Sequence, residues 1–224
     1  MIDAVAFDLD GLLVQSEEVW DEARQALVRE TGGRWHDDAT REMMGMSSVE
    51  WSRYVHDRLG VALRPEEINA RVLAEVERRY RADLPWIPGA REAVRRIAAR
   101  WPLALATSSN REIIDLVLEV GELSPCFRAT VSSEEVAKGK PAPDAYLEAA
   151  RRLGVAPERC AAVEDSTNGL KSARAAGMRV IAVPNDAFPP APEGLEAADV
   201  VLASIDELTP ETIASLPPAP SRSG

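Results

Sequence analysis

The stretch that decides the fold is VAFDLDGLLVQSE, residues 5–17. Its short apolar run predicts a buried strand, and the run ends in two aspartates, Asp8 and Asp10, one residue apart. Burying carboxylates is unfavourable unless a charge or hydrogen bonds compensate, so two of them at the end of a hydrophobic strand need a chemical reason. Gly11 follows at once and allows the chain a tight exit. The stretch therefore predicts a strand that carries ionisable groups at its carboxyl end.

Outward from this stretch, short apolar runs alternate with helical patterns, which predicts a parallel sheet flanked by helices. Most of the runs are continuous and do not alternate with polar residues, as expected for strands buried on both faces. We expect strands at residues 3–8, 102–108, 129–133, 160–165, 179–184 and 199–204. Helices are expected between them, at residues 90–100, 111–120, 143–153 and 168–176. The pattern predicts an α/β fold with a Rossmann-like parallel sheet core.

The segment after the first strand breaks this rhythm, because it has helical patterns and no strand signal. Pro65 followed by acidic residues is a typical helix start. Two prolines and a glycine in LPWIPGA, residues 84–90, then suit a stiff return to the α/β part. We predict a small all-helical cap domain inserted after the first strand. Its expected bounds are residues 15–86, with the core at 1–14 and 87–217 and a flexible tail at 218–224.

Composition and charge restrict the classes of partner. The 224 residues include 37 acidic and 26 basic side chains, a formal net charge of −11. This balance disfavours binding to nucleic acid or to an anionic membrane surface, both of which need a basic face. Two cysteines are too few for a disulfide framework. The sequence has neither a membrane-length apolar run nor a signal-peptide pattern, so we expect a cytoplasmic protein with no membrane association.

Polar residues collect where the predicted strands end. Ligands bind outside the carboxyl ends of the strands in an open parallel sheet, so these residues are expected to meet at one edge. A lysine in the loop KGKPAPD, residues 138–144, precedes a predicted helix. The residues concerned are Asp8, Asp10, Thr107, Ser108, Lys140, Glu164 and Asp165.

Carboxylates that lie close together repel one another and are driven toward protonation unless a cation is present. Oxygen ligands without histidine or cysteine favour a hard ion, and Mg²⁺ is the first choice. Mg²⁺ often shares oxygens with a substrate phosphate, so the natural chemistry is phosphoryl transfer to a carboxylate nucleophile. A hydroxyl and an ammonium group would hold the remaining phosphate oxygens.

Each piece alone also has a structural explanation. Ser109 or Asn110 could cap the helix that follows TSSN, residues 107–110. Lys140 could be a solvated lysine, and the acidic pair at 164–165 could stabilise the positive end of a helix. Only the conjunction of all the pieces at one sheet edge favours a functional site.

The motifs DLDG, ATSS, KGKPAPD and VEDSTNGLKSARAAGM occur in this order along nearly the whole chain. In order and spacing the chain resembles the haloacid dehalogenase-like hydrolase superfamily. Its nearest group has a helical cap after the first strand and includes β-phosphoglucomutase and sugar-phosphate phosphatases. The resemblance implies that Asp8 is the nucleophile and a Mg²⁺ ligand. It also implies that Asp10 is the general acid and base, with its backbone carbonyl on the metal, and that Glu164 and Asp165 complete the metal site.

The same resemblance implies that the Thr107 hydroxyl and the Ser108 backbone amide bind the phosphoryl group, while Lys140 bridges it to Asp8. Dehalogenases and phosphonate-cleaving relatives lack an aspartate two residues after the nucleophile. Asp10 therefore favours phosphate esters as substrates.

The resemblance also helps to decide whether the protein is a phosphatase or a mutase. Where the mutase has a histidine this chain has Trp20, and where the mutase has an arginine that grips a second phosphate it has Ser48. We therefore expect a phosphatase acting on a small phosphorylated metabolite, a sugar or polyol phosphate, as a monomer or weak dimer. A β-phosphoglucomutase-like mutase and a binding module without turnover are the alternatives. The expected specificity positions in the cap are Trp20, Gly45, Met46, Ser47 and Ser48.

Overall fold

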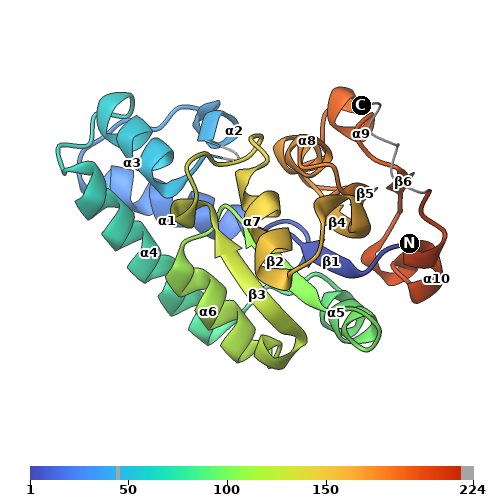
Figure 1. Cartoon of the computed structure of the whole chain (residues 1–224). Helices are drawn as coiled ribbons and strands as arrows, with labels where there is room; N and C mark the ends of the chain where they lie inside the picture. The colour runs from blue at the N-terminus through green and yellow to red at the C-terminus, as the bar shows by residue number, and fades with distance from the viewer. Residues whose placement is uncertain (44–45, 218–224) are drawn as a thin grey trace.

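The computed structural model describes residues 1–43 and 46–217. Within these residues six parallel strands form one sheet in the order β3-β2-β1-β4-β5-β6 (Figure 1). This sheet, with helices packed around it, confirms the predicted α/β fold. The strands are β1 (Ala4–Phe7), β2 (Leu103–Thr107), β3 (Phe127–Ser132), β4 (Cys160–Glu164), β5 (Arg179–Ala182) and β6 (Val200–Val201).

Helices connect the strands and cover both faces of the sheet (Figure 1). The four longer ones fall where the sequence predicts them: α5 (Ala90–Ala98), α6 (Arg111–Val120), α7 (Asp144–Leu153) and α8 (Thr167–Ala175). The short helices are α9 (Pro192–Leu195) and α10 (Pro210–Ala214), with 3₁₀ turns η1 (Ser124–Cys126), η2 (Ser133–Glu135), η3 (Pro157–Arg159) and η4 (Ile205–Glu207).

Alternate residues of each strand enter different cores. In β1, Val5 and Phe7 pack in the cluster that contains the apolar sides of α5 and α6. Ala4 and Ala6 face the other way, into a cluster with Tyr146 of α7 and the apolar side of α8. Alanines dominate this second face of the central strands, so α7 and α8 can pack close to the sheet. Close packing on both faces fixes the strand ends from which the site is built.

Four helices follow β1 before the chain returns to α5: α1 (Glu17–Glu30), α2 (Ala39–Met43), α3 (Ser48–Asp57) and α4 (Pro65–Ala82). We call residues 17–82 the helical insertion. A capping box between Ser47 and Glu50 starts α3, and Pro65 occupies the first turn of α4. The buried side of α4 packs against α1, α3 and α6, so this long helix joins the insertion to the core.

Two linker segments connect the helical insertion to the core, and they lie side by side. The backbone N–H of Gln15 donates to the Pro85 carbonyl at 2.8 Å, and that of Ile87 donates to the Leu13 carbonyl at 2.9 Å. The stiff return expected at residues 84–90 forms one side of this antiparallel pair, while the division into core and cap domains stays a prediction. Among residues 1–43 and 46–217, no helix has the length and apolarity needed to cross a membrane.

Candidate active site

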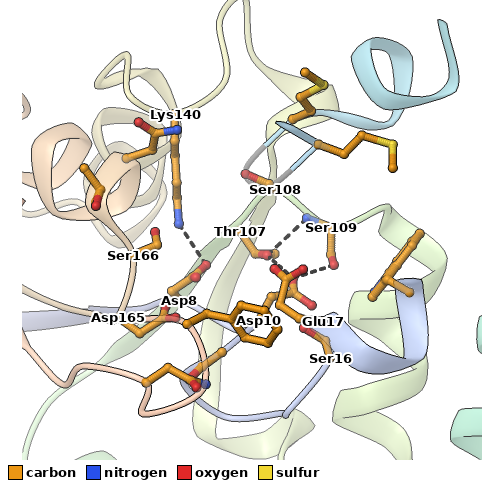
Figure 2. A pocket seen from close by; sticks show the side chains of 18 of the residues that line it. Asp8, Asp10, Ser16, Glu17, Thr107, Ser108, Ser109, Lys140, Asp165 and Ser166 are labelled. Atoms are coloured by element: carbon orange, nitrogen blue, oxygen red, sulfur yellow. Dashed lines mark hydrogen bonds and ion pairs between the residues drawn. The ribbon is translucent and has the colours of Figure 1, made fainter. Parts of the chain in front are cut away.

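A cavity of about 260 Å³ lies where the carboxyl ends of the strands meet the helical insertion (Figure 2). Six of the seven core residues singled out in the sequence line it: Asp8, Asp10, Thr107, Ser108, Lys140 and Asp165. The seventh, Glu164, is fully buried beside them. From the insertion, Trp20 and Met46 line the cavity, whereas Ser47 and Ser48 are not among its lining residues. Gly45 lies outside the described residues.

The exit from β1 aims both aspartates at the cavity. The backbone N–H of Asp8 donates to the Val163 carbonyl at 3.0 Å, which extends the β1–β4 pairing by one residue. The chain then turns at Gly11, whose φ is +78°. A Cβ atom at this position would lie 2.1 Å from the Asp165 carboxylate. Gly11 therefore provides both the left-handed turn and the room for a neighbouring carboxylate.

Lys140 is the cation at the centre of the site. Its ammonium group lies 2.8 Å from Asp8 Oδ1 and 2.5 Å from Glu164 Oε1. The hydroxyl of Tyr146, on α7, donates to the same Glu164 oxygen at 2.7 Å. All four side chains are buried. Lys140 is thus a buried, hydrogen-bonded partner of the predicted nucleophile and not a solvated lysine.

Glu164 is held on its second oxygen as well. Glu164 Oε2 accepts hydrogen bonds from the backbone N–H groups of Asp165 and Ser166, and from the Ser166 hydroxyl at 3.1 Å. A Cβ atom on Gly169, in the first turns of α8, would lie 1.9 Å from this carboxylate. The glycine lets helix α8 pass directly against Glu164.

Burial and neighbouring negative charges together raise the pKa values of carboxylates in the site. Burial raises the pKa of Asp8, the neighbouring Glu164 raises it further, and Lys140 opposes both. Burial also raises the pKa of Asp165 well above its usual range, and Glu164 and Asp8 add to the rise. For Lys140, burial acts to lower the pKa, but the carboxylates of Asp8 and Glu164 outweigh it and the pKa is raised. The site therefore holds more negative charge than one lysine balances.

The residues present fit a divalent cation. Asp8, Glu164 and Asp165 each offer an oxygen, and these oxygens lie within 4.8 Å of one another. Asp165 Oδ1 is buried and has no hydrogen-bond partner among the described residues. A buried carboxylate oxygen without a partner is costly, and a cation would remove that cost. An all-oxygen donor set of this kind suits Mg²⁺.

Two hydroxyl groups hold the carboxylate of Asp10, which lies on the side of Asp8 away from Lys140 (Figure 2). Thr107 Oγ1 donates to Asp10 Oδ2 at 3.0 Å, and Ser109 Oγ donates to the same oxygen at 2.6 Å. The backbone N–H of Ser109 in turn donates to the Thr107 hydroxyl at 3.1 Å. The Thr107 hydroxyl, predicted to bind the phosphoryl group, is here a hydrogen-bond donor to Asp10.

The segment after Thr107 does not cap α6 through a side chain. Asn110 is the N-cap residue, but its side chain makes no capping hydrogen bond. Its amide instead donates to Glu134 Oε1 at 2.9 Å. The hydroxyl of Ser48, from the helical insertion, donates to the same oxygen. Glu134 thus connects the insertion to the core, and Ser48 is part of that connection.

The sequence reasoning missed several residues that line the cavity from the helical insertion, among them Glu17 and Arg24. Figure 2 shows Glu17 facing the cavity near Asp10. A signal was present, because residues 17, 20 and 24 are spaced three and four apart and share one face of α1. Trp51, on α3, also lines the cavity.

Comparison with known proteins shows the family of the chain. Residues 2–177 match the family model of the haloacid dehalogenase-like hydrolases. Hexitol phosphatase B of Escherichia coli K12 is 34% identical over 215 residues, which cover 92% of this chain and 94% of that protein. A phosphorylated carbohydrates phosphatase of Thermotoga maritima is 33% identical over 182 residues, covering 80% of this chain and 84% of that protein.

Among solved structures, CbbY of Rhodobacter sphaeroides in complex with phosphate superposes with a TM-score of 0.82. It is 28% identical in sequence and covers 93% of this chain and 96% of its own. The family model matches most of the chain. The similarity to phosphatases extends over most of the length of both proteins. The chain belongs to the haloacid dehalogenase-like hydrolases and is a phosphoric monoester hydrolase.

Proposed function

We propose that the protein is a Mg²⁺-dependent phosphatase that hydrolyses a small phosphorylated metabolite, a sugar or polyol phosphate, through an aspartyl-phosphate on Asp8. The observation that carries the proposal is the pairing of Asp8 with Lys140 at 2.8 Å on one side of a cavity that Asp10 enters from the other. In this proposal the first carboxylate attacks the phosphoryl group and the second transfers a proton.

In the first step an Asp8 carboxylate oxygen attacks phosphorus and the ester oxygen departs with the bonding electron pair. Asp10 donates a proton to that departing oxygen, so the leaving group is released as an alcohol. The Lys140 ammonium holds Asp8 in position and offsets negative charge on the phosphoryl oxygens. The Ser108 backbone amide and the Thr107 hydroxyl are the further donors proposed for those oxygens.

In the second step the Asp10 carboxylate takes a proton from water, and the oxygen of that water attacks phosphorus. Inorganic phosphate leaves and the Asp8 carboxylate is regenerated. The hydrogen bonds from Thr107 and Ser109 keep Asp10 oriented for both proton transfers. A helical insertion that closes on the cavity would exclude bulk water between the two steps.

Asp8, Asp165, Glu164 and the backbone carbonyl of Asp10 are the groups proposed to hold Mg²⁺. When bound, the ion supplies positive charge that neutralises the carboxylates and the phosphoryl oxygens. Both Glu164 oxygens already accept hydrogen bonds from protein groups, whereas Asp165 Oδ1 accepts none from the described residues. Of Glu164 and Asp165, we therefore propose Asp165 as the principal ligand of Mg²⁺.

Two positions support hydrolysis over isomerisation. Trp20, an apolar ring with no acid–base function, lines the cavity where the mutase has a histidine. Ser48 stands where the mutase has an arginine, and its hydroxyl is bonded to Glu134. The similarity to hexitol and carbohydrate phosphatases supports a sugar or polyol phosphate as substrate.

Phosphate release from a panel of sugar and polyol phosphates, with and without Mg²⁺, tests this proposal. We expect release that requires Mg²⁺ and is lost in Asp8→Asn. The same reaction mixtures are analysed for isomerised sugar phosphate, with β-glucose 1-phosphate and a catalytic amount of a glucose bisphosphate as the mutase assay. Isomerisation with little net phosphate release would contradict the proposal and favour a mutase.

A further inference from the structure

Arg24 is a buried arginine that the chemistry above does not use. It lies on α1, is 5% exposed and lines the cavity. It belongs to the helical insertion, whereas Asp8, Lys140 and Asp165 belong to the core on the other side of the same cavity. A group bound to Arg24 would therefore belong to the leaving-group end of a substrate whose phosphoryl group lies at Asp8.

The guanidinium is held in place by aromatic rings and one backbone contact. Its central carbon lies 6.0 Å from the centroid of the Trp20 ring and 5.8 Å from that of the Trp51 ring. Its Nε donates to the Trp20 carbonyl at 3.1 Å. These contacts fix the plane of the guanidinium and leave the N–H groups of both terminal nitrogens for another partner.

Among the described residues, no counter-ion touches this cation. Within residues 1–43 and 46–217, no carboxylate oxygen lies within 4.0 Å of the Arg24 guanidinium, and its terminal nitrogens donate to no residue. Asp21, one turn away, is bonded to Gln25 at 2.7 Å and to Thr40 at 2.6 Å. Burial lowers the pKa of Arg24, although Glu17, Asp21 and Asp10 attract it from a distance. A buried charge without a contacting partner is unfavourable, so the site is suited to receive one.

The chemistry of that partner follows from the guanidinium itself. Its planar pair of terminal N–H groups matches the two oxygens of a carboxylate or a phosphate. We propose that Arg24 determines substrate specificity by binding a second acidic group on the leaving group. The substrates are then sugar or polyol phosphates whose far end carries a carboxylate or a second phosphate. This inference rests on the proposed phosphatase function and narrows it to one class of substrate.

Glu17 raises a competing interpretation that the experiment must separate. Its carboxylate faces the same cavity and, with Arg24, could bind the hydroxyl groups of a neutral polyol. Three open-chain probes with the same carbon skeleton distinguish the two interpretations. Sorbitol 6-phosphate ends in a hydroxymethyl group, 6-phosphogluconate in a carboxylate and sorbitol 1,6-bisphosphate in a phosphate.

The quantity measured is the ratio of kcat/KM for each acidic probe to that for sorbitol 6-phosphate. We expect a ratio of about 10 to 100 in the wild type, the usual value of a charged hydrogen-bonded contact. Arg24→Gln should bring the ratio to about 1, and Arg24→Lys should retain part of it. Both probes are measured on one variant, so a partial loss of folded enzyme cancels. Arg29→Gln removes the same charge from an exposed position of α1 and should leave the ratio unchanged.

A binding measurement separates this inference from the phosphatase proposal. Calorimetry measures the dissociation constant of each probe without turnover, and these constants give the corresponding ratios of affinity. The measurement is made on Asp8→Asn and on the double variant Asp8→Asn with Arg24→Gln. Three outcomes would overturn the role of Arg24. The wild-type ratio could be near 1, or Asp8→Asn could fail to bind either acidic probe. The third is a ratio that Arg24→Gln does not change. Selective binding without phosphate release from any probe would uphold Arg24 and overturn the phosphatase. Which acidic probe shows the larger ratio identifies the carboxylate or the phosphate as the group bound.

Discussion

The ammonium group of Lys140 lies 2.8 Å from the carboxylate of Asp8, and both side chains are buried. The two residues are 132 positions apart in the chain, and the parallel sheet brings them together. A nearby cation favours the ionised form of a carboxylate that burial would otherwise protonate. Lys140 therefore opposes, without abolishing, the rise that burial and Glu164 cause in the pKa of Asp8.

Replacing Lys140 with methionine should damage both activity and stability. We expect kcat/KM for phosphate release to fall by at least about 100-fold, because charge stabilisation of the phosphoryl group is lost. We also expect a loss of about 3 kcal/mol in the free energy of unfolding at neutral pH without Mg²⁺, since buried carboxylates lose their partner. Enzyme kinetics and urea unfolding measure the two effects. Lys171→Met, at a partly exposed lysine on α8, is the matched control, and near-wild-type activity in Lys140→Met would contradict the account.

Without Mg²⁺, the free energy of unfolding should fall as the pH rises above about 4. Burial raises the pKa of Asp8 and of Asp165 above the ordinary value of 3.8, so in this range the folded chain binds protons that the unfolded chain has lost. Stability from such groups is full below their unfolded pKa and is lost as the pH rises through the folded pKa. Saturating Mg²⁺ should reduce this fall, because the ion binds the ionised carboxylates of the folded state. Urea unfolding at several pH values measures both curves, and identical curves with and without Mg²⁺ would count against a metal at these residues.

Gly169→Ala should destabilise the protein, although alanine is the better helix former by about 1 kcal/mol. The added Cβ would lie 1.9 Å from the Glu164 carboxylate, which is buried and bonded to Lys140 and Tyr146. Displacing it should cost about 1 to 3 kcal/mol of unfolding free energy and weaken Mg²⁺ binding. Thermal unfolding with and without Mg²⁺ measures this. Gly139→Ala is the comparison, because its Cβ would meet only Ser133 atoms at 3.8 Å or more; equal effects of the two substitutions would refute the close approach.

The sheet and most of the site were predictable from the sequence, because both depend on local patterns. Continuous apolar runs mark strands buried on both faces, and Asp8, Thr107 and Asp165 follow such runs directly. The five-residue helix α2 was missed because so short a segment has almost no periodicity. The last strand was expected over residues 199–204 but spans only Val200–Val201, since it pairs on one side with the short β5.

The roles of side chains that face one another across the fold were less predictable. The sequence marks Ser109 and Asn110 as possible helix caps, yet the first bonds to Asp10 and the second to Glu134. Both alternatives use the same polar groups, and only the tertiary packing decides between them. Arg24 shares a helix face with Trp20, but an arginine on a helix is usually solvated, so this spacing alone does not place its guanidinium in a buried cavity.

Ser109→Ala should slow the chemical step in a way that depends on the leaving group. The substitution removes the 2.6 Å hydrogen bond that orients Asp10, so proton donation to the leaving oxygen becomes less efficient. We expect kcat to fall by about 10-fold with an alkyl phosphate, the effect of about one hydrogen bond. With p-nitrophenyl phosphate the fall should be smaller, because that leaving group departs without a proton. Steady-state kinetics with both substrates measures this, and equal losses would mean that Ser109 does not act through Asp10.

The most direct test of the central claim is to detect the covalent intermediate. Wild-type enzyme is mixed with Mg²⁺ and a substrate from the panel, quenched in acid within the first turnover and treated with borohydride, which reduces an aspartyl-phosphate to homoserine. Peptide mass spectrometry should find homoserine at position 8 and aspartate at position 10, with neither change in samples lacking substrate or in Asp8→Asn. Rapid Mg²⁺-dependent phosphate release without homoserine at position 8, or full activity in Asp8→Asn, would contradict the proposed mechanism.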